Sequence, residues 1–420
     1  MTLAHRLGAA TVTVLGADGR PLPGIDVTVA QRRHAFGFGN IGFDFIPLAN
    51  GEGGHPEALE SLADLWLDVF NTATLPFYWG RFEPHRGRPD TLRLRRTAQW
   101  FADRGVALKG HPLVWHTVTA PWLLGLPPEE VERVQRERIR RDVGDFAGLI
   151  DTWDAINEAV IMPVFDKEDN GITRLCRRLG RVPTVRLAFD EARAANPDAT
   201  LLLNDFDLSP AYERLIEAVL EAGVKIDVLG LQSHMHQGYW GEEKTLAILD
   251  RFARFGLPIH FTESTLLSGH LMPPEIEDLN DYQLAQWPST PEGEARQADE
   301  IVRHYTTLAS HPAVQAVTYW GLTDDGAWLG APGGLVRADG TPKPAYDALR
   351  HLVKDEWWLG PTVLRTDDAG RVAVRGWLGD YEVTAGGSTS TFALTGADGV
   401  VACTLGGALG AVRPSSRRTT

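Results

Sequence analysis

Six successive apolar segments of the chain each end in side chains that can do chemistry. Single polar residues at strand ends are common because strand ends meet water, but six in a row predict a shared site. In a parallel barrel, active sites are built at the C-terminal ends of the strands, so these groups would converge on one face. The groups are His111, Trp115 and His116; Asn157 and Glu158; Asn204 and Asp205; Gln232, Ser233 and His234; Thr262 and Glu263; and Trp320.

The two glutamates of this set, Glu158 and Glu263, form a candidate catalytic pair. They follow the fourth and seventh predicted strands, so their carboxyls can face each other across the mouth of a barrel. Two facing carboxyls suit glycoside hydrolysis. A separation of about 5–5.5 Å between them would mean that the anomeric configuration is retained through a covalent glycosyl-enzyme intermediate. The environment must raise the pKa of the acid relative to its partner. Asn157 can donate to a sugar 2-hydroxyl, and His234 can hold Glu263 ionised.

A metal-dependent hydrolase is the alternative chemistry. Its usual markers are a His-x-His pair on the first strand and a metal-bridging lysine, and the first predicted strand has neither. We therefore predict no metal and no cofactor. The residues that such a site would use are His111, His116, His234, His236 and Asp205.

Eight short apolar runs alternate with amphipathic helical stretches in the middle of the chain, which predicts βαβ units and a parallel sheet. Eight such units in about 320 residues fit a (β/α)8 TIM barrel with some long loops. The predicted strands are 35–40, 69–75, 107–115, 152–157, 200–205, 228–234, 258–264 and 315–321.

An open, doubly wound sheet is the competing fold. Residues 37–42 (GFGNIG) have the letters of a dinucleotide-binding motif. No helix is predicted to open at the third glycine, so this match is read as chance.

Both ends of the chain carry a different, β-rich pattern with turn residues at short intervals. An N-terminal hairpin is marginal alone, so we expect one small β-sandwich assembled from both termini. The predicted domains are N-terminal strands in 1–34, a catalytic barrel in 35–356, the rest of the sandwich in 357–413 and a disordered tail in 414–420.

Composition excludes several classes of function. With 41 basic and 55 acidic residues the net charge is −14, so nucleic-acid and membrane-surface roles are not expected. Thirteen tryptophans in an acidic protein favour a sugar ligand. The N-terminus lacks a secretory signal pattern, so a cytoplasmic location is expected unless a leader precedes this sequence. The oligomeric state stays open.

The ordered motifs resemble glycoside hydrolase family 10, a family mainly of retaining endo-β-1,4-xylanases on a (β/α)8 barrel. The resemblance implies Glu158 as acid/base and Glu263 as nucleophile. It places His111, Trp115, Asn157, Gln232, Trp320 and Trp328 around the substrate, and His116, His234 and Asn204 in support of the carboxylates. The motifs are GHPLVWH (110–116), WDAINE (153–158), LND (203–205), GLQSH (230–234), FTE (261–263) and YWGLTD (319–324).

The second-strand region departs from the family pattern. The Glu-Asn pair of the family is missing from 70–84, and Tyr78 falls where a glycone-binding lysine is expected. After the nucleophile the family has Leu-Asp, whereas this chain has Ser264-Thr265. We therefore place Tyr78 among the substrate-binding residues. We also expect the residues that bind the glycone to differ from those of the family. The alternatives are an exo-acting β-glycosidase or diglycosidase, or an inert sugar-binding protein on the same scaffold.

Two further tryptophans lie in loops after predicted strands. The long segment 266–297 contains Trp287 and is expected to form a rim over the aglycone side. Trp240 follows the sixth predicted strand, where it offers either a stacking platform or local packing.

Overall fold

A computed structural model describes residues 2–52, 56–396 and 399–406. The chain divides into two compact units. One runs from Gly37 to Leu352, and the other combines Thr2–Phe36 with the chain from Val353 onward. The expected tail, 414–420, and the end of the expected sandwich segment beyond 406 lie outside the described residues.

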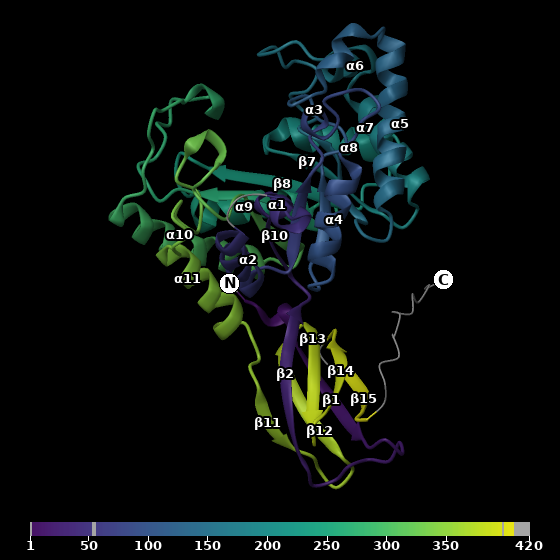
Figure 1. Ribbon diagram of the computed structural model, residues 1–420, viewed down its shortest axis with the longest axis vertical. Coiled ribbons are helices and arrows are strands. Elements are labelled where there is room, and N and C mark those ends of the chain that lie inside the picture. The colour runs from purple at the N-terminus through teal and green to yellow at the C-terminus, as the bar shows by residue number, and fades with distance from the viewer. Residues whose placement is uncertain (1, 53–55, 397–398, 407–420) are drawn as a thin grey trace. The chain divides into compact units, whose positions relative to one another are not determined.

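The first unit is a closed barrel of eight parallel strands in the order β10-β3-β4-β5-β6-β7-β8-β9 (Figure 1). This confirms the predicted TIM barrel. The strands are β3 (Gly37–Ile41), β4 (Thr72–Pro76), β5 (Ala107–His111), β6 (Thr152–Asn157), β7 (Thr200–Asp205), β8 (Val228–Met235), β9 (Ile259–Leu266) and β10 (Val314–Tyr319).

The third barrel strand is shorter than the sequence predicted. The expected strand 107–115 was wrong at its end, because β5 stops at His111. Pro112 has no N–H to continue the ladder and so ends the strand. Trp115 and His116 consequently lie in the loop beyond β5 rather than on the strand itself.

Helices connect the barrel strands, and several begin at sequence signals. The side chain of Ser209 accepts a hydrogen bond from the N–H of Ala211 at the start of α8, and Thr290 accepts from Gly293 at the start of α10. The α-helices are α1 (Ile46–Asn50), α2 (Pro56–Val69), α3 (Trp79–Phe82), α4 (Thr91–Ala102), α5 (Pro128–Phe146), α6 (Gly171–Leu179), α7 (Arg181–Ala195), α8 (Pro210–Glu221), α9 (Gly241–Ala253), α10 (Pro291–Ser310) and α11 (Pro344–His351). Shorter turns are η1 (Ala4–Arg6), η2 (Phe43–Phe45), η3 (Pro121–Gly125), η4 (Leu279–Asp281), η5 (Trp328–Gly330) and the π-helical η6 (Leu352–Glu356).

A buried aromatic group fixes the barrel where β5 meets β6. The ring of Trp153 is fully buried and lies 4.7 Å from that of Phe77, centroid to centroid. A Cβ on Gly110 would come within 2.2 Å of the Trp153 ring, so a glycine is required there. This packing brings β5 and β6 together, and with them the two segments that carry Trp115 and Glu158.

The second unit is a pair of sheets built from both ends of the described chain (Figure 1). One sheet has the order β12-β1-β15 and the other β11-β2-β13-β14. Side chains from both sheets share one core, which includes Val12, Val29 and Val383. The predicted sandwich from both termini is therefore confirmed. Its strands are β1 (Leu7–Leu15), β2 (Asp26–His34), β11 (Thr362–Arg365), β12 (Arg371–Trp377), β13 (Gly379–Ala385), β14 (Ser388–Leu394) and β15 (Gly399–Thr404).

The long segment after β9 folds over a small core of its own. Trp287 is only 6% exposed and packs with Leu267, Met272 and Ala331. Its indole N–H donates to the carbonyl of His270 at 3.0 Å. Trp287 therefore packs inside its loop and presents no open face to a ligand. Among the described residues, none of the helices combines the length and the apolar character that spanning a membrane requires.

Candidate active site

Glu263 lies on β9, buried at the mouth of the barrel and held at both carboxylate oxygens. Asn204 Nδ2 donates to Oε1 at 3.0 Å, and His234 Nε2 lies 3.1 Å from Oε2. Because an ionised carboxylate can only accept, Nε2 carries the proton, and Nδ1 faces the Thr265 hydroxyl at 3.0 Å. His234 thus lies in hydrogen-bond contact with Glu263 on one side and with Thr265 on the other.

The surroundings of Glu263 favour its ionised form. Burial by itself would raise its pKa, but the hydrogen bond from His234 and the electrostatic influence of His111, His234 and Lys109 outweigh it. The pKa of Glu263 is consequently held below its usual value of 4.5. The group is a carboxylate across the neutral range, available to attack or to stabilise positive charge.

Glu158 directly follows β6 and receives three hydrogen bonds. Trp115 Nε1 donates to Oε2 at 2.7 Å, while Asn157 Nδ2 and Gln232 Nε2 donate to Oε1 at 3.0 and 3.3 Å. Its backbone has a φ of 58°, in the left-handed region that non-glycine residues rarely adopt. Such strain concentrates at functional positions, where the surrounding structure over-determines it.

The pKa of Glu158 moves in the opposite direction to that of Glu263. Burial raises it, the negative charge of Glu263 raises it further, and the three hydrogen bonds only partly oppose this. The result is a pKa of about 7. Two carboxyls at one mouth therefore differ in protonation near neutral pH, which is the arrangement that separates an acid from a base or nucleophile.

A cluster of amides connects the two carboxyls. Asn204 Nδ2 donates to Asn157 Oδ1 at 2.8 Å, and Gln232 Nε2 donates to the same oxygen at 3.0 Å. Thr262 Oγ1 in turn donates to Asn204 Oδ1 at 2.6 Å. These contacts fix which end of each amide faces Glu158 or Glu263, so the amide N–H groups point at the carboxylates.

A buried charge cluster beneath the site was not predicted from the sequence. Asp154 on β6 has one oxygen 2.8 Å from Lys109 Nζ and 2.6 Å from His111 Nδ1. Lys109 and His111 are two apart on β5, so they share a face of the strand. Charged residues inside otherwise apolar strands were the available signal. The cluster orients His111 and supplies positive charge near Glu263.

The predicted aromatic residues form a continuous wall beside the carboxyls. The Tyr78 ring lies 5.4 Å from that of Trp115 and 5.7 Å from that of His111. Trp320 lies 5.2 Å from His111 and 6.2 Å from His234, and Trp328 lies 5.0 Å from His234. The structure thus brings every predicted substrate-binding ring to the same mouth.

Phe43 joins this wall although no sequence pattern singles it out. Its ring meets those of both Tyr78 and Trp320 edge-on at 5.9 Å. Phe43 follows β3, so the wall spans the loops after β10, β3, β4 and β5.

His116 lies close to the pair but makes a weaker contact than expected. Its Nε2 is 3.9 Å from Glu158 Oε2, which is beyond hydrogen-bond reach. Burial lowers the pKa of His116 to about 4, and its ring packs against Phe165 at 4.4 Å. The ring acts mainly as an apolar wall beside Glu158.

Asp205 anchors the segment that follows Glu158. Its Oδ2 accepts from the backbone N–H of Val160 at 3.0 Å, and its Oδ1 accepts from that of Asp207, also at 3.0 Å. Burial raises the pKa of Asp205 to about 8. Within the described residues, no group of three or more His, Cys, Asp or Glu side chains is placed to hold a metal ion.

Comparison with known proteins gives consistent matches to the barrel. The family model "Glycosyl hydrolase family 10" matches residues 70–352. Endo-1,4-beta-xylanase B of Thermotoga neapolitana is 28% identical over 299 residues, which are 66% of this chain and 78% of that protein. Anti-sigma-I factor RsgI6 of Acetivibrio thermocellus is 24% identical over 383 residues. That match covers 89% of this chain but 44% of that protein, so this chain spans less than half of it.

A solved structure shows the same fold. Xylanase 10B from Thermotoga petrophila RKU-1, in complex with xylobiose, superposes with a TM-score of 0.62 at 22% identity. The likeness covers 77% of this chain and 95% of that chain.

Proposed function

Because the chain belongs to glycosyl hydrolase family 10, we propose that it is a retaining β-glycosidase with Glu158 as acid/base and Glu263 as nucleophile. The observation that carries the assignment is the pair of buried carboxyls at one barrel mouth, with Glu263 held by Asn204 and His234 and Glu158 held by Trp115, Asn157 and Gln232. The pKa of Glu158 is raised to about 7, while that of Glu263 is held below 4.5.

In the first step, Glu263 attacks the anomeric carbon as the bond to the leaving oxygen breaks. Glu158 gives its proton to that oxygen, and a covalent glycosyl-enzyme forms. We infer that the amide of Asn157, which donates to Glu158 at 3.0 Å, also donates to the sugar 2-hydroxyl.

In the second step, Glu158 is a carboxylate and takes a proton from water, which attacks the same anomeric carbon. Glu263 leaves as a carboxylate and the sugar is released with its original configuration. The hydrogen bonds from Asn204 and His234 to Glu263 stabilise it as a leaving group.

We propose that the substrate is a β-linked glycan or glycoside of the xylan type, with altered recognition of the glycone. The support is the aromatic wall, in which Tyr78 stands where the resemblance leads one to expect a lysine. Burial raises the pKa of Tyr78 well above its usual value, so its hydroxyl stays neutral. The neutral phenol of Tyr78, beside the ring of Phe43, thus stands in place of a lysine ammonium group that would bind sugar hydroxyls.

A panel of substrates tests this proposal. Aryl β-xylobioside, other aryl β-glycosides and plant diglycosides should be cleaved, and long xylan should be cleaved at least about tenfold more slowly than by a family 10 xylanase assayed alongside. Loss of one hydrogen bond from a charged group, worth about 1.5–3 kcal/mol, gives this magnitude. Equal rates on long xylan would contradict the altered glycone side. Preference for short glycosides cleaved from one end would favour the exo-acting alternative.

The pH profile of kcat/KM should be bell-shaped with its falling limb near pH 7. Glu263 must be ionised, so activity rises with pH below 4.5; Glu158 must be protonated, so activity falls as pH passes about 7. Trp115→Phe removes the hydrogen bond that stabilises ionised Glu158. Its falling limb should therefore move to higher pH by about one to two units, given about 1.5–3 kcal/mol for such a bond.

Trp328→Phe is the matched control for this shift. It also trims an indole at the mouth, but its ring contacts His234 and His236 and not Glu158. Its falling limb should stay in place. A Trp115→Phe profile that is unmoved, or moved to lower pH, would contradict the role given to that bond.

A further inference from the structure

An ion pair joins two loops at the barrel mouth whose strands are three steps apart. Lys167 lies in the loop after β6, and its Nζ is 3.0 and 2.9 Å from the two carboxylate oxygens of Asp281. Asp281 ends η4 in the loop after β9, and Asp278 Oδ2 lies 3.7 Å from the same ammonium group. In the ring of strands, β7 and β8 stand between β6 and β9. We call this contact the Lys167 bridge.

The acidic end of the bridge lies on a segment that is held by its own contacts. The ring of Tyr282 meets that of Trp287 edge-on at 5.1 Å, within the small core of the loop after β9. Gln237, in the loop after β8, donates to the carbonyls of Pro273 and Ile276 at 2.9 and 2.7 Å. These contacts fix the backbone on both sides of η4.

The basic end of the bridge is anchored in the same way. Arg177 of α6 donates to the carbonyls of Pro163 and Phe165, each at 2.7 Å. The side chain of Asn170 accepts from the N–H of Thr173 at the start of α6. Closing the bridge therefore orders mainly the lysine side chain, because the backbone at both ends is already fixed.

Strand order places the bridge on the side of the mouth away from the aromatic wall. The wall covers the loops after β10, β3, β4 and β5, which are one half of the ring. The bridge spans the other half, and it joins the loops of the two strands that lead to Glu158 and Glu263. Since the glycone is assigned to the wall, the leaving group occupies the half that the bridge spans.

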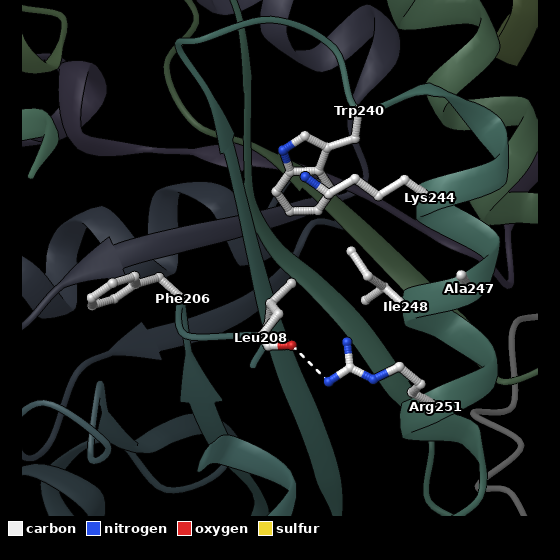
Figure 2. Close-up of a pocket in the computed structure, with 7 residues that line it drawn as sticks. All are labelled: Phe206, Leu208, Trp240, Lys244, Ala247, Ile248 and Arg251. Atoms are coloured by element: carbon white, nitrogen blue, oxygen red, sulfur yellow. Dashed lines mark hydrogen bonds between the residues drawn. The ribbon is translucent and has the colours of Figure 1, made fainter. Parts of the chain in front are cut away.

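Open space lies in this half of the mouth. The segments after β7 and β8 and helix α9 enclose about 340 Å³, with Phe206 and the half-buried Trp240 among the lining residues (Figure 2). Arg251 of α9 fixes one wall by donating to the carbonyl of Leu208 at 3.0 Å (Figure 2). A neighbouring hollow of about 280 Å³ is lined in part by His234. Side chains thus leave room for a leaving group on this side of the carboxyls.

We propose that the Lys167 bridge determines the length of substrate that the enzyme accepts. When the bridge is closed, a glycoside with a short leaving group is admitted, whereas a long β-glycan requires the bridge to open. The inference rests on the proposed function, since it concerns the leaving group of the same reaction. The side chains of Lys167 and Asp281 are 54% and 58% exposed, so water and salt compete with the pair and it can open.

Substitution at Lys167 tests the bridge through a ratio of two rates. The ratio is kcat/KM on xylohexaose divided by kcat/KM on aryl β-xylobioside. Lys167→Ala should raise it about two- to fivefold, the range over which an exposed ion pair shifts an equilibrium. Lys225→Ala is the matched control, because Lys225 forms an exposed ion pair with Asp227 just before β8, at the opposite end of the barrel. Its ratio should equal that of the wild type.

Exchanging the charges separates the bridge from a general effect of removing a lysine. Lys167→Asp should raise the ratio at least as much as Lys167→Ala. The double variant Lys167→Asp/Asp281→Lys re-forms the pair and should return the ratio toward the wild-type value. A double variant with the same ratio as Lys167→Asp would overturn the bridge.

Salt gives an independent readout on the unmodified protein. Raising NaCl from 0.05 to 1 M shortens the screening length to about 3 Å and weakens exposed ion pairs. The wild-type ratio should therefore rise with salt, while that of Lys167→Ala should stay flat. Equal salt dependence in the two proteins would contradict the proposal.

Association measured without turnover distinguishes the bridge from the proposed chemistry. Xylohexaose binding to Glu263→Gln protein can be followed by tryptophan fluorescence in a stopped-flow instrument. Adding Lys167→Ala should raise the association rate about two- to fivefold. Equal association rates would overturn the bridge. Failure of the wild-type protein to cleave any glycoside would instead overturn the proposed function, while the association rates would still report on the bridge. Xylohexaose that binds neither protein would overturn both.

Discussion

Glu263→Gln should lose more than about 10⁴-fold in kcat on every substrate, the scale seen when a nucleophile is removed. The amide cannot form the glycosyl-enzyme, yet it keeps the shape and one hydrogen-bond acceptor for Asn204 or His234. Substrate affinity should therefore change far less than kcat. Initial rates with aryl β-xylobioside measure the loss in kcat, and calorimetric titration measures the substrate affinity.

Glu263→Ala adds a chemical control to this result. With a small anion such as azide present, the cavity left by the carboxylate should allow direct attack on the anomeric carbon, giving a glycosyl azide of inverted configuration. A variant at Glu263 that retains full activity without such an anion would rule out the proposed nucleophile.

Glu158→Ala should lose about 10²–10⁴-fold on substrates with poor leaving groups, the usual contribution of general acid catalysis. Glycosides with very acidic leaving groups need no proton, so their first step should be nearly unaffected and the glycosyl-enzyme should accumulate. A burst of leaving group in rapid-mixing kinetics, followed by slow turnover, is the expected signature.

The pH profile offers a second readout for Glu158→Ala. The falling limb near pH 7 should disappear, because the group with a pKa of about 7 is gone. Equal losses on good and poor leaving groups, with the falling limb still present, would assign the acid to another residue.

The fold was predictable because its signals are local and repeated. Alternating strand and helix patterns predicted the barrel, and the turn-rich ends predicted the sandwich. Glu158 and Glu263 could be selected because each is the only glutamate at its strand end, and a barrel gathers those ends on one face.

What the sequence could not supply depends on contacts distant in the chain. Lys109 and His111 lie on one face of β5, but only the pairing of β5 with β6 brings Asp154 into contact with both of them. Trp287 and Trp320 are the same residue type, but Trp287 is buried in a small local core. The end of β5 at His111 was missed for a different reason. The run of apolar residues continues past Pro112, and this pattern outweighed the proline as a signal that the strand ends.

The interleaving of the two chain ends has a consequence for synthesis. β1 lies between β12 and β15, and β2 lies between β11 and β13, so neither has a sheet neighbour until the C-terminal strands are made. The ribosome must first translate the whole barrel, Gly37–Leu352, which takes roughly 15–60 s at about 5–20 residues per second. During that interval each nascent chain carries two unpaired strands whose open edges invite pairing with other chains. The unit whose first strands leave the ribosome before the barrel is thus the last to be completed.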